Sequence, residues 1–252
     1  MNERPIRIGI FGRGRLGAAV AALVERTPGM VLAWTAGSCD APGKGADAAL
    51  DASASGAVSG HVGWAIESGT ALVIGATGWD SSIVESLDAG ALSIGIMTAP
   101  NFSMAVALMR RAAFALGRFA AREPGADLSV LERHHAGKAD APSGTATLLA
   151  AALASGSGRH QGWTTGRAEQ GTINIASLRS GSTVGYHELR YEAPMENLVF
   201  SHEAFSRDVF ARGALEALLW IRGRRGIFRF DDMAAEIMDE LFFPGRGSER
   251  NN

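Results

Sequence analysis

Side chains capable of acid–base chemistry are concentrated between residues 131 and 145. His134, His135 and Lys138 place two imidazoles and an ammonium group close together in the chain. Imidazoles titrate near neutral pH, and an ammonium group can balance an anion or donate a proton. This spacing predicts a site for a small anionic substrate. The alternative is a solvated basic loop, since adjacent side chains of a strand point to opposite faces.

The residues after this cluster predict a helix. Asp140-Ala141-Pro142 is typical of a helix start because proline suits the first turn, and residues 145–153 consist largely of strong helix formers. The backbone N–H groups of Ser143, Gly144 and Thr145 would then point out of the helix N-terminus. We expect a substrate carboxylate to bind there.

A metal site is not expected. The histidines lack the His-x3-His spacing typical of zinc ligands, and the single cysteine, Cys39, is remote in sequence. One cysteine also excludes an intrachain disulfide and suits a reducing compartment. The N-terminus has no apolar signal region, and no segment approaches the length of an apolar membrane span. These features predict a cytoplasmic protein without a membrane partner.

The overall composition is that of a globular enzyme. The 252 residues are 46% hydrophobic and 20% charged, which is enough for one large domain or two smaller ones. The net charge of −2 provides no general attraction to nucleic acid, so no nucleic-acid partner is expected. The 32 glycines indicate many tight turns and fit an α/β enzyme.

A strand, a glycine-rich turn and a helix follow one another at the N-terminus. Residues 6–11 are strand-like, Gly12-Arg13-Gly14-Arg15-Leu16-Gly17 has the G-x-G-x-x-G pattern, and residues 18–24 favour helix. Glycines let the backbone approach a pyrophosphate, and the helix N-terminus receives its charge. The turn therefore predicts dinucleotide binding, with a simple tight turn as the alternative.

The second strand, residues 30–35, bears on which nicotinamide cofactor binds. NAD sites commonly place Asp or Glu at the end of this strand to accept a hydrogen bond from the ribose 2′-OH. Thr35-Ala36-Gly37-Ser38-Cys39 stands there instead, with no arginine immediately after it. Asp40 or a residue from elsewhere could take that role. We expect NADPH or NADH, and favour NADPH slightly.

Two later strands end in small residues that suit a cofactor. Residues 71–74 lead into Gly75-Ala76-Thr77, and residues 92–97 lead to Ala99-Pro100-Asn101-Phe102. Open parallel sheets bind ligands outside the carboxyl ends of their strands. Both loops are therefore predicted to line the nicotinamide half of the site, although simple turns would also explain them.

Strand and helix patterns alternate up to about residue 116, with a short helix expected at residues 61–67. His61 itself is interpreted as a surface residue and not as a ligand. This alternation predicts an α/β, Rossmann-like, doubly wound parallel sheet. The following strand-like runs are separated by Gly, Ser and Pro turns and predict a second α+β domain on a mostly antiparallel sheet. These runs are residues 127–132, 171–178, 184–191 and 197–202.

Amphipathic helices at residues 210–221 and 230–241 are expected to pack back on the first domain. We therefore predict a dinucleotide-binding domain at 1–102 and 208–252, and a substrate-binding and oligomerisation domain at 103–207. His187 and His202 lie within strand-like alternation and are interpreted as structural. The Gly-, Ser- and charge-rich tail from Pro244 is predicted to be disordered.

Several motifs together resemble the 4-hydroxy-tetrahydrodipicolinate reductase family, also called dihydrodipicolinate reductases. The most specific is Glu132-x-His134-His135-x-x-Lys138-x-Asp140-Ala141-Pro142-Ser143-Gly144-Thr145. The others are Gly75-Ala76-Thr77-Gly78, Asn101-Phe102-Ser103, Arg179-Ser180-Gly181 and Val184-Gly185-x-His187. The likeness spans nearly the whole chain.

The resemblance implies a two-domain homotetramer that uses NADH or NADPH to reduce a cyclic imine carrying two carboxylates. On that pattern His134 matches the proton donor or acceptor and Lys138 the proton donor. His135, Gly144 and Thr145 match contacts to the substrate carboxylates. The chemistry of the residues agrees, because a dianion needs cationic partners and hydride addition to a C=C–C=N system leaves an anionic atom to be protonated.

The chain departs from the family pattern in three places. The first turn is one residue shorter than the frequent G-x-x-G-x-x-G, and the acidic residue after the second strand is missing. Asp51-Ala52-Ser53-Ala54-Ser55-Gly56 stands where Asp-Phe-Ser/Thr-x-x-Pro is expected, which leaves the third strand open. Two alternatives therefore stand beside the reductase: an imine reductase acting on another carboxylated ring, and a nucleotide-binding paralogue without catalysis.

Overall fold

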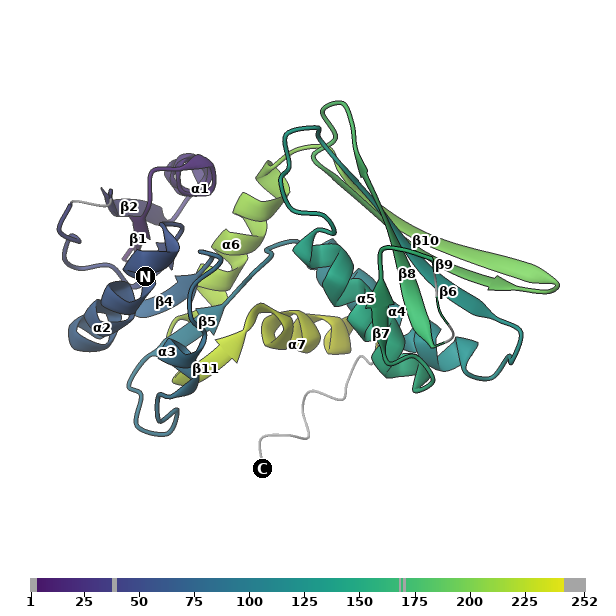
Figure 1. The fold of residues 1–252 in the computed structure, drawn as a ribbon. Coiled ribbons are helices and arrows are strands. Elements are labelled where there is room, and N and C mark those ends of the chain that lie inside the picture. The colour runs from purple at the N-terminus through teal and green to yellow at the C-terminus, as the bar shows by residue number, and fades with distance from the viewer. Residues whose placement is uncertain (1–3, 38–39, 168, 170, 243–252) are drawn as a thin grey trace. The chain divides into compact units, whose positions relative to one another are not determined.

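The computed structural model describes residues 4–37, 40–167, 169 and 171–242. The chain divides into two compact units, residues 1–103 with 208–252 and residues 104–207, each built around its own sheet (Figure 1). Within the described ranges, no helix combines the length and the apolar run that a bilayer crossing requires. Cys39 and the tail from Pro244, for which disorder was predicted, fall outside the described residues.

The first unit holds a six-stranded sheet in the order β11-β5-β4-β3-β1-β2, and every neighbouring pair is parallel. Its strands are β1 (Ile6–Phe11), β2 (Met30–Ala36), β3 (Ala48–Asp51), β4 (Ala71–Ile74), β5 (Gly95–Thr98) and β11 (Gly226–Arg229). Its helices are α1 (Arg15–Arg26), the 3-10 turn η1 (Ser55–Ala57), α2 (Val58–Ser68), α3 (Ser82–Glu85), α6 (Asp208–Ile221) and α7 (Phe230–Phe242). The Rossmann-like, doubly wound parallel sheet is confirmed.

The predicted return of the C-terminal helices is also found, since α6 packs against α1, β3, β4 and β5. The third strand had no readable periodicity because Ala48, Ala49, Leu50 and Asp51 are all fully buried. Parallel strands covered on both faces show no alternation of polar and apolar residues. Composition alone therefore could not place β3.

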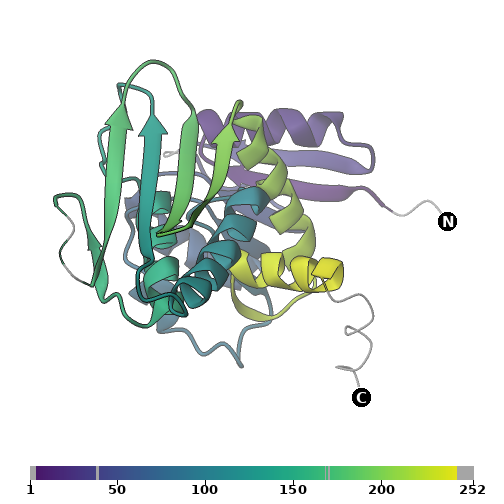
Figure 2. The ribbon, with the colours of Figure 1, turned by 90° about the vertical axis from the view of Figure 1, so that its right-hand side faces the viewer.

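The second unit holds a five-stranded sheet in the order β10-β9-β6-β8-β7, seen in Figure 2. Its strands are β6 (Asp127–His134), β7 (Gly162–Thr164), β8 (Thr172–Arg179), β9 (Gly185–Ala193) and β10 (Glu196–Ala204). Its helices are α4 (Met104–Ala120) and α5 (Gly144–Ser157), both on one side of the sheet in Figure 1.

This second sheet is mixed rather than mostly antiparallel. Strand β9 is antiparallel to β6 and β10, whereas β8 is parallel to both β6 and β7. Helix α5 connects β6 to β7, and a helical crossover of this kind brings the chain back to start a parallel strand. Turn residues between strand-like runs do not reveal which strands become neighbours.

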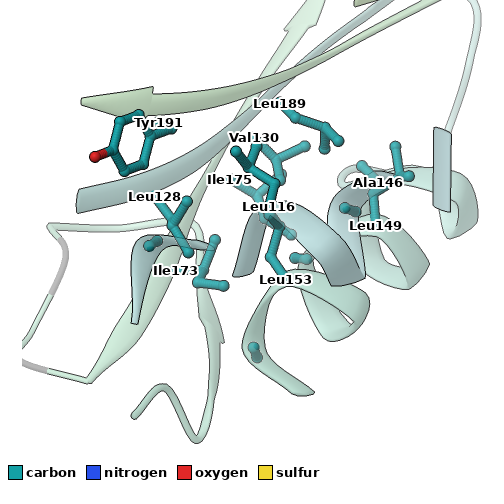
Figure 3. Close-up of a cluster of buried hydrophobic side chains, with 14 of the residues drawn as sticks. Leu116, Leu128, Val130, Ala146, Leu149, Leu153, Ile173, Ile175, Leu189 and Tyr191 are labelled. Carbon is teal, nitrogen blue, oxygen red and sulfur yellow. The ribbon is translucent and has the colours of Figure 1, made fainter. Parts of the chain in front are cut away.

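Apolar residues from the sheet and both helices form the core of the second unit (Figure 3). Two glycines let the helices meet: a Cβ at Gly117 would lie 2.3 Å from the carbonyl oxygen of Leu153, and one at Gly156 would lie 2.1 Å from that of Phe114. The core includes Val130, Leu149, Leu153, Ile175 and Leu189. This close packing fixes α5 against β6, and so fixes the N-terminus of α5 beside the end of that strand.

Candidate active site

Strand β6 changes character at its carboxyl end. Leu128 and Val130 point into the core, and Glu132 and His134 continue the same alternation on the same face. Both polar side chains are buried, with 0% and 8% of their residue surface exposed. The site therefore begins where the apolar row of β6 gives way to charged and polar groups.

Helix α5 begins two residues later than predicted. Ser143 is the N-cap and its Oγ accepts a hydrogen bond from the Ala146 N–H at 3.2 Å, so Pro142 precedes the cap instead of opening the first turn. A serine that satisfies a first-turn N–H stabilises a helix start, which proline cannot do with its side chain. The N–H of Ser143 donates to Oε1 of Glu132 at 3.2 Å. It is therefore not open to a substrate, contrary to our expectation.

Gly144 is the first residue of α5 and is exposed. A Cβ built there would meet nothing within 4 Å, so the protein itself does not require glycine at this position. First-turn N–H groups have no acceptor within their own helix, and the helix dipole favours an anion beside them. Thr145 follows in the same turn. The backbone around Gly144 has the chemistry and the open space of a carboxylate site.

Glu132 connects the strand, the helix start and a neighbouring strand. Its Oε1 accepts from Nη2 of Arg179 on β8 at 2.6 Å, and its Oε2 is hydrogen-bonded to Nδ1 of His134. Burial would raise the pKa of Glu132, but hydrogen bonds from Arg179, Ser177 and His134 lower it below its ordinary value. The carboxylate is therefore ionised at neutral pH, and its charge is balanced inside the fold.

His134 has the protonation behaviour of a base. Burial is the main cause that lowers its pKa, the charges of Lys138 and Arg179 add to this effect, and Glu132 opposes it. The imidazole is consequently neutral at pH 7. Its Nδ1 faces Glu132, which leaves Nε2 as the atom that can exchange a proton with a ligand.

A second buried imidazole, that of His187 on β9, lies beside His134. The two ring centroids are 5.2 Å apart, and Nε2 of His187 lies 3.3 Å from Oγ of Ser143. Burial lowers the pKa of His187 to about 3, so this ring stays neutral. His187 therefore supports the helix cap and the His134 ring. His202, on β10, is the residue opposite His187 in the antiparallel pair of β9 and β10.

Lys138 and His135 lie on the loop between β6 and α5. The Lys138 Nζ lies 2.7 Å from Oδ1 of Asp140, and the N–H of His135 donates to the carbonyl of Thr183 at 2.8 Å. Arg179 also donates to the carbonyl oxygen of Asp140 at 2.5 Å. His135 and Lys138 thus share one loop, which is held by hydrogen bonds to Thr183 and to Arg179 of β8.

The linking role of Glu132 and Arg179 was missed by sequence reasoning. A signal existed, because Glu132 occupies an inward position of a strand whose other inward positions are apolar. A charge at such a position must find partners inside the protein. Arg179, 47 residues away, could be recognised as that partner only in three dimensions.

The glycine-rich turn of the first unit joins β1 to α1 as expected, and its glycines differ in purpose. Gly12 has φ +96°, and a Cβ there would lie 2.3 Å from the carbonyl oxygen of Ala52. A Cβ at Gly17 would lie 2.0 Å from the carbonyl oxygen of Gly12. Gly14, the N-cap of α1, has open space where its Cβ would be. The residues present fit a pyrophosphate beside Gly14 and the N-terminus of α1.

The loops after β4 and β5 also lie together. The N–H groups of Gly75 and Ala76 donate to the carbonyl oxygen of Asp51, at 2.8 and 3.0 Å. A Cβ at Gly75 would lie 2.6 Å from the ring of Phe102, which is buried. Asn101 accepts from the N–H of Ser103 through Oδ1 at 2.8 Å. The structure thereby gathers the predicted loops, which contain Thr77, Ala99 and Pro100, at one edge of the sheet.

An ion pair that was not predicted lies at the end of β2. Nη2 of Arg13 is 2.7 Å from Oδ2 of Asp40, and the same oxygen accepts from the N–H of Gly37 at 2.9 Å. Arg13 also reaches the carbonyl of Thr35 at 3.3 Å. An acidic and a basic side chain are therefore both present at the end of β2, where a bound dinucleotide would place its adenosine ribose, although 27 residues separate them in sequence.

His61, predicted to be a surface residue and not a ligand, has a side chain that is 20% exposed and has partners in the fold. Its Nδ1 lies 2.8 Å from Oδ2 of Asp51, which is fully buried at the end of β3, and its ring stacks on Phe11 at 3.8 Å. The helix that carries it, α2, is longer than predicted. His61 thus helps to seat α2 on the sheet, since it satisfies a buried carboxylate.

Comparison with known proteins covers most of the chain. Two family descriptions match it: "Dihydrodipicolinate reductase, N-terminus" over residues 36–102 and "Dihydrodipicolinate reductase, C-terminus" over residues 102–234. The 4-hydroxy-tetrahydrodipicolinate reductase of Acidiphilium cryptum is 36% identical over 236 residues, covering 89% of this chain and 95% of the relative. That of Gluconobacter oxydans is 37% identical over 243 residues, covering 90% and 96%.

This chain belongs to the dihydrodipicolinate reductase family. The resemblance inferred from the motifs is therefore confirmed. A solved dihydrodipicolinate reductase from Paenisporosarcina sp. TG-14, with dipicolinate bound, has the same fold, with a TM-score of 0.76 over 91% of this chain and 99% of that one at 21% identity. The roles assigned to individual site residues of this family member stay predictions.

Proposed function

We propose that this protein reduces 4-hydroxy-tetrahydrodipicolinate to tetrahydrodipicolinate with NADPH or NADH, a step in lysine and diaminopimelate biosynthesis. Family membership supports the reaction. The observation that carries the proposal is the grouping of His134, Lys138 and the exposed Gly144 at the start of α5 around a buried, ionised Glu132. This arrangement combines proton transfer with binding of an anion.

The residues of the second unit bind the two carboxylates of the substrate. Lys138 and His135 supply positive or hydrogen-bond-donating groups, and Gly144 and Thr145 present the first turn of α5. A doubly negative ring needs both kinds of partner, because a single cation would leave one carboxylate uncompensated. The second unit therefore selects a small cyclic dianion.

The chemistry requires a hydride and a proton. A reduced nicotinamide, when bound, supplies the hydride. Loss of the 4-hydroxyl as water leaves a C=C–C=N system that takes up the hydride at one end and the proton at the other. Lys138 provides that proton as its ammonium group, and the neutral His134 exchanges protons through Nε2. One cofactor molecule is oxidised for each ring reduced.

The first unit holds the cofactor through residues that fit it. Gly12-Arg13-Gly14-Arg15-Leu16-Gly17 receives the pyrophosphate, and the loops at 75–77 and 99–102 line the nicotinamide side. We propose a preference for NADPH because Arg13 can bind the 2′-phosphate. Asp40 supports residual NADH binding, since its carboxylate can accept from the ribose hydroxyls.

We also propose that four copies assemble through the uncovered face of the second sheet. Leu131, Leu178 and Val199 lie on the face opposite α4 and α5 and are 40%, 51% and 43% exposed. Apolar side chains exposed on a sheet face favour association. The cytoplasmic location expected from the single cysteine stays a prediction.

Steady-state kinetics test the proposed function. The unstable substrate is generated in place from aspartate semialdehyde, pyruvate and the preceding synthase, and absorbance at 340 nm reports NADPH or NADH. We expect cofactor consumption that depends on all components. A folded protein that binds NADPH but oxidises none would support the non-catalytic paralogue, and activity only on another carboxylated imine would support the other alternative.

A further inference from the structure

Glu132 links three elements of the site through hydrogen bonds. It has no exposed surface, and its two oxygens hold a donor on each of three elements: His134 on β6, Arg179 on β8 and the N–H of Ser143 at the cap of α5. A buried carboxylate that accepts so many hydrogen bonds fixes the geometry of its donors. All three donors are groups of the protein itself.

We propose that Glu132 is a positioning residue, which sets the tautomer and orientation of His134 and couples that ring to the carboxylate-binding turn of α5. The inference rests on the proposed function for its catalytic meaning. The tautomer itself is a property of the protein without ligands. Glu132 touches neither substrate nor cofactor in this proposal.

The tautomer follows from which groups can donate. An ionised carboxylate only accepts hydrogen bonds, so Nδ1 of His134 must carry its proton toward Glu132. Nε2 then holds the lone pair. A Cβ at Gly185 would lie 3.1 Å from this Nε2, so glycine at this position keeps a side chain away from that atom. The orientation of the ring therefore favours proton exchange at Nε2.

The coupling to the turn follows from the other oxygen of Glu132. Oε1 holds the N–H of Ser143, the residue directly before Gly144. Arg179 binds the same Oε1 and the carbonyl of Asp140, at 2.6 and 2.5 Å. The loop that carries Lys138 is thus tied to the group that orients His134. A shift of the carboxylate would displace the proton-exchanging ring and the anion site together.

The isosteric Glu132→Gln variant separates positioning from simple packing. Arg179 and the Ser143 N–H only donate, so the amide oxygen must face them and the amide NH₂ must face Nδ1 of His134. Nδ1 then has to accept, and the proton moves to Nε2. A wrong tautomer in an intact fold is known to be costly in catalysis. We expect kcat to fall on the order of 100-fold with little change in cofactor affinity.

The experiment compares wild type, Glu132→Gln and Glu236→Gln with the full chain. Glu236 is a matched control, because it also pairs with an arginine, Arg224, but lies on α7 in the other unit. ¹⁵N NMR of the histidine rings, assigned by loss of signal in His134→Gln, reports the tautomer. We expect Nδ1–H in wild type and Glu236→Gln, and Nε2–H in Glu132→Gln, with thermal unfolding used to confirm the fold.

The outcomes distinguish this inference from the proposed function. Wild-type His134 in the Nε2–H form would overturn the inference even if Glu132→Gln failed to fold. An unchanged tautomer and unchanged kcat in folded Glu132→Gln would also overturn it. A wild type that shows the expected tautomer but no reductase activity would instead count against the proposed function, because the NMR readout needs no substrate.

Discussion

Lys138 and Asp140 form an ion pair in the loop before α5, with Nζ 2.7 Å from Oδ1. The Asp140 side chain is 57% exposed, and solvent-exposed pairs of this kind contribute little to stability. Lys138 lowers the pKa of Asp140, so the partner is ionised in the unliganded protein. In the proposed mechanism, a substrate carboxylate replaces Asp140 on Lys138 at small cost, because the exposed ion pair contributes little.

Lys138→Ala tests this role directly. Loss of the proton donor and the carboxylate partner is expected to lower kcat on the order of 100- to 1,000-fold, within the range of general acid catalysis. The cofactor Kd, measured by NADPH fluorescence, should not change. Lys44→Ala is the matched control, since Lys44 is the other lysine of the chain and is exposed. Unchanged turnover in Lys138→Ala would remove this residue from the mechanism.

Gly144→Ala tests the carboxylate-binding turn without disturbing the fold. A Cβ at Gly144 meets no protein atom within 4 Å, and alanine favours a helix more than glycine does. The melting temperature should therefore stay level or rise, while KM rises roughly tenfold because the methyl group crowds the bound carboxylate. Gly63→Ala, in α2, has the same open space and should leave KM unchanged. Wild-type KM in Gly144→Ala would place the carboxylate elsewhere.

Arg13 and Asp40 are expected to act oppositely on cofactor choice. Arg13→Ala should weaken NADPH binding about tenfold and NADH binding much less, because a charged hydrogen bond to phosphate is lost. Asp40→Asn should strengthen NADPH binding, since a carboxylate no longer repels the phosphate. Fluorescence titration with each cofactor measures both Kd values. Arg4→Ala removes a comparable exposed arginine pair, with Asp47, and serves as control. Equal losses for both cofactors in Arg13→Ala would contradict this assignment.

The buried His187 predicts a loss of stability in acid. Its pKa is about 3 in the folded protein against 6.5 as the ordinary value, so between these limits the unfolded chain binds the extra proton. The free energy of unfolding therefore falls as pH decreases below about 6.5, by up to ~1.4 kcal/mol per pH unit from this one group. Above about pH 6.5 this group adds no pH dependence.

His187→Phe removes that titration. Urea unfolding between about pH 7.5 and 5 should give a flatter dependence than wild type, although the variant loses the contact to Ser143 and is less stable at pH 7.5. His134, His160 and His202 also have lowered pKa values and are present in both proteins, so only the difference in slope is interpreted. Identical slopes would show that His187 is protonated or exposed in the folded state.

Leu131→Arg tests the proposed assembly. The substitution places a charge on the uncovered sheet face and is expected to shift a tetramer to smaller species in light scattering. Leu108→Arg, on α4 with similar exposure of 37%, is the control and should keep the wild-type mass. A monomeric wild type at micromolar concentration would contradict the assembly before any variant is made.

The chemistry of this protein could be predicted largely from short-range patterns. Strand, glycine turn and helix follow one another within residues 6–26, and the His-His-Lys cluster lies next to the helix start in the chain itself. Such features depend on backbone geometry and residue type over a few positions, which the sequence displays directly. The same patterns support the family resemblance.

Strand pairing and the partners of the charged residues depend on residues that are distant in sequence, so they required the tertiary structure. Strand β3 is buried on both faces and shows no period, and the parallel pairing of β6 with β8 depends on where the α5 crossover returns the chain. The partners Glu132–Arg179 and Arg13–Asp40 are brought together only by folding. Local sequence selects the groups that can react, whereas the packing of distant elements decides which charges they meet and therefore how they are oriented.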